Sequence, residues 1–461
     1  MKTIKYAVFA AVLIAISCNN LLAQTDEKPR NLILMIGDGM GFAQVKSYRY
    51  FANNPATSEI ELLPFDAYLV GAVATETIAA PPGEDTCPDS CDPDPYAVVE
   101  SASSASAYAT GMNTQHSHLG MAADGQIQQN ISEKARQAGK SIGIVATSEI
   151  THATPAAFAA HVNNRRESAS IADQYFDLQW EDKPIVSVFL GGGESHLKRE
   201  DRDLTAEFAA SGYTLVSNRD ELLQAEGPRV LGLFAKEGMP RNWDRDTTDP
   251  SLADMTGKAL NILSKNPQGF LLVVEGSQID WAAHDNDVVG VISEMQDFSN
   301  AIDRALAFSQ KHGDTLVIIL ADHETGGMSL GIDNVYAWNP RPLRGMNQTP
   351  EAMVKQFLTG DELLSDIVTA SVSFELTNEE KTYLDSFERV SAINPETGYE
   401  EPPAYKAIHQ VFDQRTLTGW STMGHTGVDV PIYATGPGSE QFHGVMRNEE
   451  VGQKLQEVFL P

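Results

Sequence analysis

The strongest constraint on the fold is a series of short apolar runs, each ending in a glycine turn or in polar side chains. These runs lie at residues 31–36, 141–147, 184–193, 230–234, 269–274, 315–320 and 431–435. Helical periodicity separates several of them, most clearly at 251–265 and 287–311. Buried strands that alternate with helices predict an α/β fold, with a central, largely parallel sheet and helices on both faces.

The length of the chain limits the number of domains, and its charge limits the classes of ligand that it can bind. The chain has 461 residues and a formal charge of −30, enough for one large domain with insertions or for two domains. The acidic surplus argues against a nucleic-acid-binding surface, which would be basic. An anion-binding site on this chain would therefore need its own local positive charge, from metal ions or an arginine.

Residues 1–23 have the pattern of a signal peptide: a basic start, an apolar stretch too short to cross a bilayer, and the sequence Leu21-Leu22-Ala23 before a cleavage site. No later segment has the pattern of a transmembrane span. We expect a mature chain of residues 24–461 that is periplasmic or secreted. Cys18 lies in a weak lipobox pattern, so a lipid-anchored form is the alternative.

Two cysteines, Cys87 and Cys91, remain after removal of the signal peptide. An exported chain meets an oxidising compartment, where such a pair forms a small local disulfide loop. A metal site at these cysteines is less favoured, because no histidine lies near them in the sequence.

Residues 99–111 (VESASSASAYATG) are small, rich in hydroxyl groups and nearly uncharged. The alanines favour a helix, and a helix N-terminus presents free N–H groups to an anion. Ser101 would lie at that N-terminus, directly after Glu100, where a nucleophile can attack a phosphate ester. For this segment alone, a tightly packed helix of small residues is the simpler interpretation.

Carboxylates and imidazoles gather after the apolar runs. They are Asp38, Glu275, Asp280, His284, Asp322, His323 and His425. Asp280 and His284 are four residues apart, which places them on one helix face. So many carboxylates in one place would repel unless cations neutralise them. Mixed imidazole and carboxylate ligands suit Zn²⁺, and all-oxygen ligands suit Mg²⁺.

The segment HATPAAFAAHVNNRR, residues 152–166, predicts a helix with Thr154 as N-cap and Pro155 in its first turn. Arg165 would lie about three turns further on. By itself, the pair of Arg165 and Arg166 has the pattern of solvent-exposed side chains.

Residues 331–418 differ from the rest, because they are polar and acidic and contain several prolines. We expect an insertion with its own helices, including 351–358 and 378–387, before the main domain resumes near Gly419.

Six motifs together resemble those of the alkaline phosphatase family. In chain order they are IGDGMG, ESASSASAYATG, HATPAAFAAHVNNR, VEGSQIDWAAH, ADHETGG and GHTG. They span residues 31–436 in the family's order. The resemblance implies an alkaline-phosphatase-like α/β sandwich and hydrolysis of small phosphate monoesters. It also implies a homodimer and a crown-like insertion.

The resemblance also implies a role for each site residue. Ser101 matches the nucleophile that becomes phosphoserine, and Arg165 matches the arginine that holds phosphate. Two Zn²⁺ and one Mg²⁺ are implied. Their ligands would be Asp280, His284 and His425 for the first zinc, Asp38, Asp322 and His323 for the second, and Asp38, Thr154 and Glu275 for magnesium.

Three residues depart from the commoner pattern. Glu100 replaces an aspartate before the nucleophile, which changes how Arg165 is held. His152 and Trp281 stand where the best-known bacterial form has Asp and Lys, so the third site could take another divalent metal.

Two other classes share part of this pattern. A phosphodiesterase, phosphomutase or sulfatase of the same superfamily would carry the same metal-binding motifs, but the Ser101 motif and the 154–165 segment favour a monoesterase. A non-catalytic metal-binding surface protein would be expected to lose Ser101 or a ligand, and all of them are present.

Overall fold

The computed structural model describes residues 28–57, 59–78, 97–391 and 402–461. Its centre is a ten-stranded mixed sheet. The strands, in spatial order, are β16 (Gly444–Arg447), β2 (Leu69–Ala74), β15 (Val430–Thr435), β10 (Thr315–Leu320), β1 (Asn31–Gly37), β9 (Phe270–Gly276), β3 (Ser141–Glu149), β6 (Val188–Gly192), β8 (Val230–Leu233) and β7 (Thr214–Val216).

The seven strands from β10 to β7 are parallel, and β15 is antiparallel to its neighbours. Every residue of β1, β9 and β10 is buried, which is the expected result for strands covered on both faces. The sequence therefore predicted the fold class correctly.

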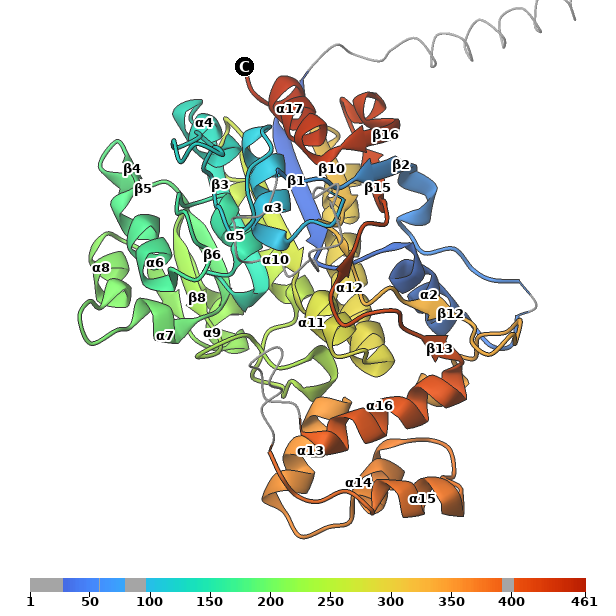
Figure 1. The fold of residues 1–461 in the computed structure, drawn as a ribbon. Coiled ribbons are helices and arrows are strands. Elements are labelled where there is room, and N and C mark those ends of the chain that lie inside the picture. The colour runs from blue at the N-terminus through green and yellow to red at the C-terminus, as the bar shows by residue number, and fades with distance from the viewer. Residues whose placement is uncertain (1–27, 58, 79–96, 392–401) are drawn as a thin grey trace, which may run out of the picture.

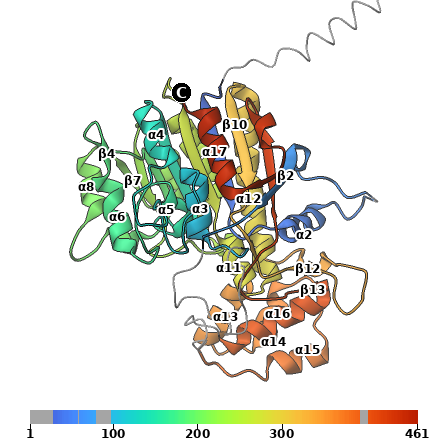
Figure 2. The same cartoon turned by 45° about the horizontal axis from the view of Figure 1, so that its top comes forward.

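Helices cover both faces of the sheet (Figures 1 and 2). On one face α3 packs with α4, α5 and α17, and on the other α12 packs with α2 and α10. The bounds are α2 (Phe42–Ala52), α3 (Ser101–Thr110), α4 (Ile131–Gln137), α5 (Ala153–Ala157), α10 (Leu252–Leu263), α12 (Val288–His312) and α17 (Asn448–Phe459).

The remaining elements are short. They are α6 (Ser168–Asp177), α7 (Glu194–Leu197), α8 (Leu204–Ala210), α9 (Arg219–Gln224), α11 (Gln278–His284), the pairs β4 (Gln179–Trp180) with β5 (Lys183–Pro184) and β11 (Glu324–Thr325) with β14 (His425–Thr426), and the 3₁₀ turns η1 (Asp66–Tyr68), η2 (Asn242–Asp244), η3 (Arg341–Leu343) and η4 (Ser439–Phe442).

A separate layer of helices follows β12 (Ser329–Leu330) and ends at β13 (Thr418–Gly419), which pairs with it. Its helices are α13 (Pro350–Thr359), α14 (Leu364–Ser371), α15 (Asn378–Leu384) and α16 (Pro403–Thr416). They fall within the 331–418 segment that composition sets apart. Both views place α11 between the central sheet and this layer.

The signal-peptide segment 1–23, Cys18, Cys87 and Cys91 lie outside the described residues. Across the part of the chain that is described, every helix is too short or too polar to cross a membrane.

Candidate active site

The predicted acidic residues converge because their strands are neighbours in the sheet. Asp38 follows β1, Glu275 lies near the end of β9, and Asp322 follows β10. Both β9 and β10 pair with β1 in parallel, so their carboxyl ends meet at one edge. All three carboxylates are at most 1% exposed. This edge is where open α/β sheets place their ligands.

One group of ligands comes from the short helix α11 and the strand β14. His284 and Asp280 share a face of α11, as their spacing predicted, with 3.4 Å between Nε2 and Oδ2. His425 Nε2 lies 3.6 Å from Asp280 Oδ1 and 3.1 Å from His284 Nε2. The three side chains predicted for the first zinc are thus brought together.

The histidines of this site are held in one tautomer by their outer nitrogens. His284 Nδ1 contacts the Met423 carbonyl, and His425 Nδ1 contacts the Val99 carbonyl at 2.8 Å. Because a carbonyl only accepts hydrogen bonds, each Nδ1 carries the proton. In the neutral form of each ring, Nε2 then turns a lone pair inward, the arrangement that a metal ligand requires. Burial lowers the pKa of His284, but the Asp280 carboxylate outweighs it and raises that pKa to about 9, so metal binding at His284 releases a proton.

A second group surrounds His323, which is fully buried. Its Nε2 lies 3.4 Å from Asp38 Oδ1, 3.3 Å from Asp322 Oδ2 and 3.2 Å from Ser101 Oγ. One nitrogen thus faces two carboxylates and the predicted nucleophile. Burial and the neighbouring His425 hold the pKa of His323 well below its ordinary value, so the ring is neutral.

Sequence reasoning did not single out Thr325, which joins these two groups. Its hydroxyl accepts from His323 Nδ1 at 3.1 Å and donates to Asp280 Oδ1 at 2.5 Å. The only signal in the sequence is its position two residues after His323 in the short strand β11.

A third group consists of Asp38, His152 and Glu275, whose potential ligand atoms lie within 4.8 Å of one another. The Thr154 hydroxyl lies against Glu275, and Thr154 is fully buried. The Trp281 ring meets His152 edge to face, with 5.8 Å between ring centres. His152 and Trp281 therefore do border the cluster.

The cluster needs cations. Both carboxylate oxygens of Asp38, one of Asp322 and one of Glu275 are buried and, within the described residues, accept no hydrogen bond. Burial raises the pKa of Asp322 to about 8 and that of Glu275 to about 7. Burial and the neighbouring Asp322 raise the pKa of Asp38 well above its ordinary value. Orphaned carboxylates beside inward-facing imidazoles fit a metal-ligand set.

Ser101 is the first residue of α3, as predicted, and is 2% exposed. The Glu100 carboxylate caps this helix by accepting from Ala102 N–H at 2.9 Å and Ser103 N–H at 2.7 Å. It also pairs with Arg165 Nη1 at 2.6 Å. The guanidinium is therefore held beside the helix terminus that carries the serine.

The predicted helix over 156–166 is wrong, and so is the N-cap at Thr154. Helix α5 ends at Ala157, and its N-cap is His152, without a side-chain hydrogen bond. The reason is tertiary: Val162 pairs with Leu119 through two backbone hydrogen bonds, of 2.9 and 3.0 Å. That pairing outweighs the helix propensity of the alanines.

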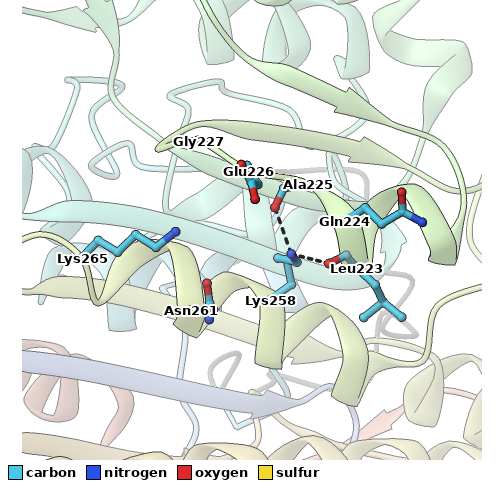
Figure 3. A pocket seen from close by; sticks show the side chains of 8 residues that line it. All are labelled: Leu223, Gln224, Ala225, Glu226, Gly227, Lys258, Asn261 and Lys265. Carbon is cyan, nitrogen blue, oxygen red and sulfur yellow. Dashed lines mark hydrogen bonds between the residues drawn. The ribbon is translucent and has the colours of Figure 1, made fainter.

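A surface hollow of about 700 Å³ lies elsewhere, between α10 and the segment after α9 (Figure 3). The Lys258 ammonium in it donates to the carbonyls of Leu223 and Ala225, at 2.8 and 3.0 Å. None of the predicted site residues lines it.

Comparison with known proteins gives one consistent result. Residues 29–460 match the alkaline phosphatase family. Alkaline phosphatase 3 of Bacillus subtilis is 41% identical over 92% of this chain and 88% of its own length. The crystal structure of a cold-active alkaline phosphatase from Shewanella sp. superposes with a TM-score of 0.80 at 33% identity, over 94% of this chain and all of that one.

A third relative is a variant of the alkaline phosphatase of the Antarctic bacterium TAB5. It has one histidine replaced by glutamate and carries magnesium in a site called M3. It superposes with a TM-score of 0.65 at 27% identity, covering 94% of this chain and 98% of that one.

A buried carboxylate–imidazole cluster at the carboxyl edge of an α/β sheet, facing a serine at a helix N-terminus, defines a metal-dependent hydrolase. The sequence and structural matches specify the family of hydrolases. The chain belongs to the alkaline phosphatase family. Its activity is the hydrolysis of phosphate monoesters.

Proposed function

We propose that the chain hydrolyses small phosphate monoesters in two steps, through a phosphoserine at Ser101, with two zinc ions and one magnesium ion. The observation that carries this proposal is the position of His323 Nε2, which faces Asp38, Asp322 and Ser101 Oγ within 3.4 Å. The proposed nucleophile and the three proposed ligands of the second zinc therefore lie next to one another.

The ligand assignment follows the three groups, except that Thr154 rather than His152 completes the third. Asp280, His284 and His425 would hold the first zinc, and Asp38, Asp322 and His323 the second. Asp38, Glu275 and Thr154 would hold magnesium. When bound, these ions lower the pKa of the serine hydroxyl and neutralise charge on the leaving oxygen and on the carboxylates.

The chain's own residues then perform the transfer. Ser101 Oγ attacks phosphorus, the ester P–O bond breaks, and the alcohol leaves with a proton. Water then breaks the bond between Ser101 Oγ and phosphorus and releases inorganic phosphate. Arg165 holds two phosphoryl oxygens with its fork of N–H groups, and Glu100 keeps that fork oriented. The N-terminus of α3 adds favourable charge for the same anion.

The third site is the one most open to another divalent metal. His152 Nε2 accepts from Arg165 Nη2 at 3.1 Å, while its Nδ1 is buried without a partner among the described residues. In the TAB5 variant, magnesium occupies M3 where one histidine has become an acid. The acid in that variant accompanies bound magnesium. We propose that a histidine at the third site, His152 in this chain, weakens the preference for magnesium.

The remaining properties rest on the sequence. We propose that residues 1–23 direct export to the periplasm or beyond, with a lipid anchor at Cys18 as the alternative, and that Cys87 and Cys91 form a disulfide. The −30 charge argues against nucleic acid as a partner, and the proposed metal ions and Arg165 would supply the local positive charge for small phosphate monoesters. We further propose that the enzyme assembles as a homodimer.

Metal content and activity test the core of this proposal. The purified protein should contain two zinc ions and one further divalent ion per chain. Chelation should abolish hydrolysis of an aryl phosphate, and zinc with magnesium should restore it. Full activity in a preparation shown to be metal-free would refute the mechanism. Faster cleavage of an aryl diester than of the monoester would indicate a phosphodiesterase, and faster cleavage of an aryl sulfate would indicate a sulfatase.

A further inference from the structure

We propose that Arg241 is a positioning residue for the first metal site, because its single guanidinium holds both ends of the helix that carries Asp280 and His284. The inference rests on the metal assignment proposed above. It concerns a residue with no ligand atom of its own, which acts only through α11.

The contacts of Arg241 bracket the two ligands. Its Nη1 donates to the Gln278 carbonyl at 3.1 Å, at the first residue of α11. Its Nη2 donates to Asp285 Oδ2 at 3.0 Å, at the residue that follows His284. One planar group therefore fixes the start and the end of a helix of seven residues. A helix this short has little stability of its own.

The loop that presents Arg241 is itself anchored. Met239 N–H donates to the Thr147 carbonyl of β3 at 3.0 Å. On the other side, Asn242 N–H donates to Glu294 Oε1 of α12 at 2.7 Å. The Arg241 side chain is 3% exposed, so the guanidinium is packed as well as bonded. We call the contacts of Arg241 with Gln278 and Asp285 the clamp on α11. Because the loop of Arg241 is bonded to β3 and α12, the clamp fixes α11 relative to the main sheet.

The third nitrogen of the Arg241 guanidinium group, Nε, contacts the helical layer inserted between β12 and β13. Arg241 Nε donates to Glu351 Oε2 on α13 at 3.0 Å. Beside it, Asp244 Oδ1 accepts from Thr349 N–H, the N-cap of α13, at 2.8 Å. The insertion therefore meets the first metal site through Arg241, in agreement with the position of α11 between the two layers (Figure 2).

The test is the rate of zinc release from the fully loaded enzyme to a chromogenic chelator. Arg241→Lys retains the charge but cannot reproduce three directed hydrogen bonds. It should speed the release of one of the two zinc ions by about 10- to 100-fold, as expected when the support of a metal ligand is lost. The second zinc, whose ligands lie outside α11, should leave at the wild-type rate.

Arg229→Lys is the matched control. Arg229 is also a buried arginine, 8% exposed, and its Nη1 donates to the Pro184 carbonyl at 3.0 Å and the Tyr213 hydroxyl at 2.7 Å, neither of which belongs to α11 or to the Arg241 loop. The Arg229→Lys variant should lose stability without a selective change in zinc release. Glu351→Ala removes only the hydrogen bond from Arg241 to α13 and should have a smaller effect than Arg241→Lys.

Four outcomes would overturn the inference. The first three are unchanged zinc release in Arg241→Lys, equal acceleration of both zinc ions, and the same selective acceleration in Arg229→Lys. The fourth is an effect of Glu351→Ala as large as that of Arg241→Lys. Wild-type protein that holds no zinc would instead refute the proposed function, so the two failures are distinguishable.

Discussion

The Glu100 carboxylate caps α3 and pairs with Arg165. Since α3 carries the proposed nucleophile and Arg165 is the proposed phosphate-holding residue, we expect neutralisation of Glu100 to lower both stability and substrate affinity. Glu100→Gln retains the size of the side chain and one carbonyl acceptor. It removes the ionic partner of Arg165 and one acceptor for the N–H groups of Ala102, Ser103 and Ser117, which now bind the carboxylate at 2.7–3.0 Å.

The size of the effect follows from the pKa. Burial alone would raise the pKa of Glu100, but Arg165 and the three backbone N–H groups lower it from 4.5 to about 2. A difference of somewhat over two pH units corresponds to about 3 kcal/mol. Because glutamine still accepts a hydrogen bond, we expect a loss of about 2 kcal/mol in the free energy of unfolding at pH 7, together with a raised KM.

The sign of the pH dependence follows from the same shift. A carboxyl with a depressed folded-state pKa stabilises the protein fully above its unfolded pKa of 4.5. That contribution is lost as the pH falls from about 4.5 through about 2. The difference in stability between wild type and Glu100→Gln should therefore shrink over that range, whereas it should be constant from pH 6 to 8.

Urea unfolding and steady-state kinetics on an aryl phosphate measure both effects. Asp203→Asn is the control, because Asp203 caps α8 by accepting from Ala206 N–H without the arginine that Glu100 holds. Its KM should be unchanged. A Glu100→Gln variant with wild-type stability and KM would refute the reasoning, because Arg165 would then be oriented without the carboxylate.

Three further predictions test the site and the proposed disulfide. Ser101→Ala should abolish phosphoserine formation and lower hydrolysis by orders of magnitude; acid-quenched labelling that still finds phosphate on the variant would contradict the assignment. His152→Asp combined with Trp281→Lys should increase magnesium affinity and tighten inhibition by inorganic phosphate, each by about 1–2 kcal/mol. Isothermal titration and a phosphate inhibition constant decide this, and unchanged values would leave the pair a packing role. Cys87 and Cys91 should be bridged, so mass spectrometry of the unreduced protein should find no free thiol at either.

The strands that carry the cluster could be predicted because they depend on local patterns, whereas β2, β7 and β16 were not predicted. The run of residues 31–36 is apolar throughout and ends in a glycine turn, and β1 covers it as Asn31–Gly37. Parallel neighbours then bring Asp38, Glu275 and Asp322 to one edge without further information. The helix face shared by Asp280 and His284 follows from a spacing of four residues.

The segment after Thr154 could not be predicted in the same way. Its alanines and Pro155 favour a helix, but α5 stops at Ala157 because Val162 pairs with Leu119, more than forty residues earlier in the chain. No local pattern records that pairing. The same bend brings Arg165 to Glu100, so the functional contact depends on the break in the helix.

Arg241 shows why the supports of a site are harder to predict than its ligands. Ligands have diagnostic chemistry at strand ends, whereas Arg241 lies in a polar segment with no periodicity around it. Its role arises from three acceptors, in Gln278, Asp285 and Glu351, that only the folded chain assembles. An arginine in such a segment has the pattern of a solvated surface residue, and burial of its side chain to 3% exposure reverses that interpretation. The ligand set is therefore specified by the motifs, while its rigidity is specified by contacts between segments that are distant in sequence.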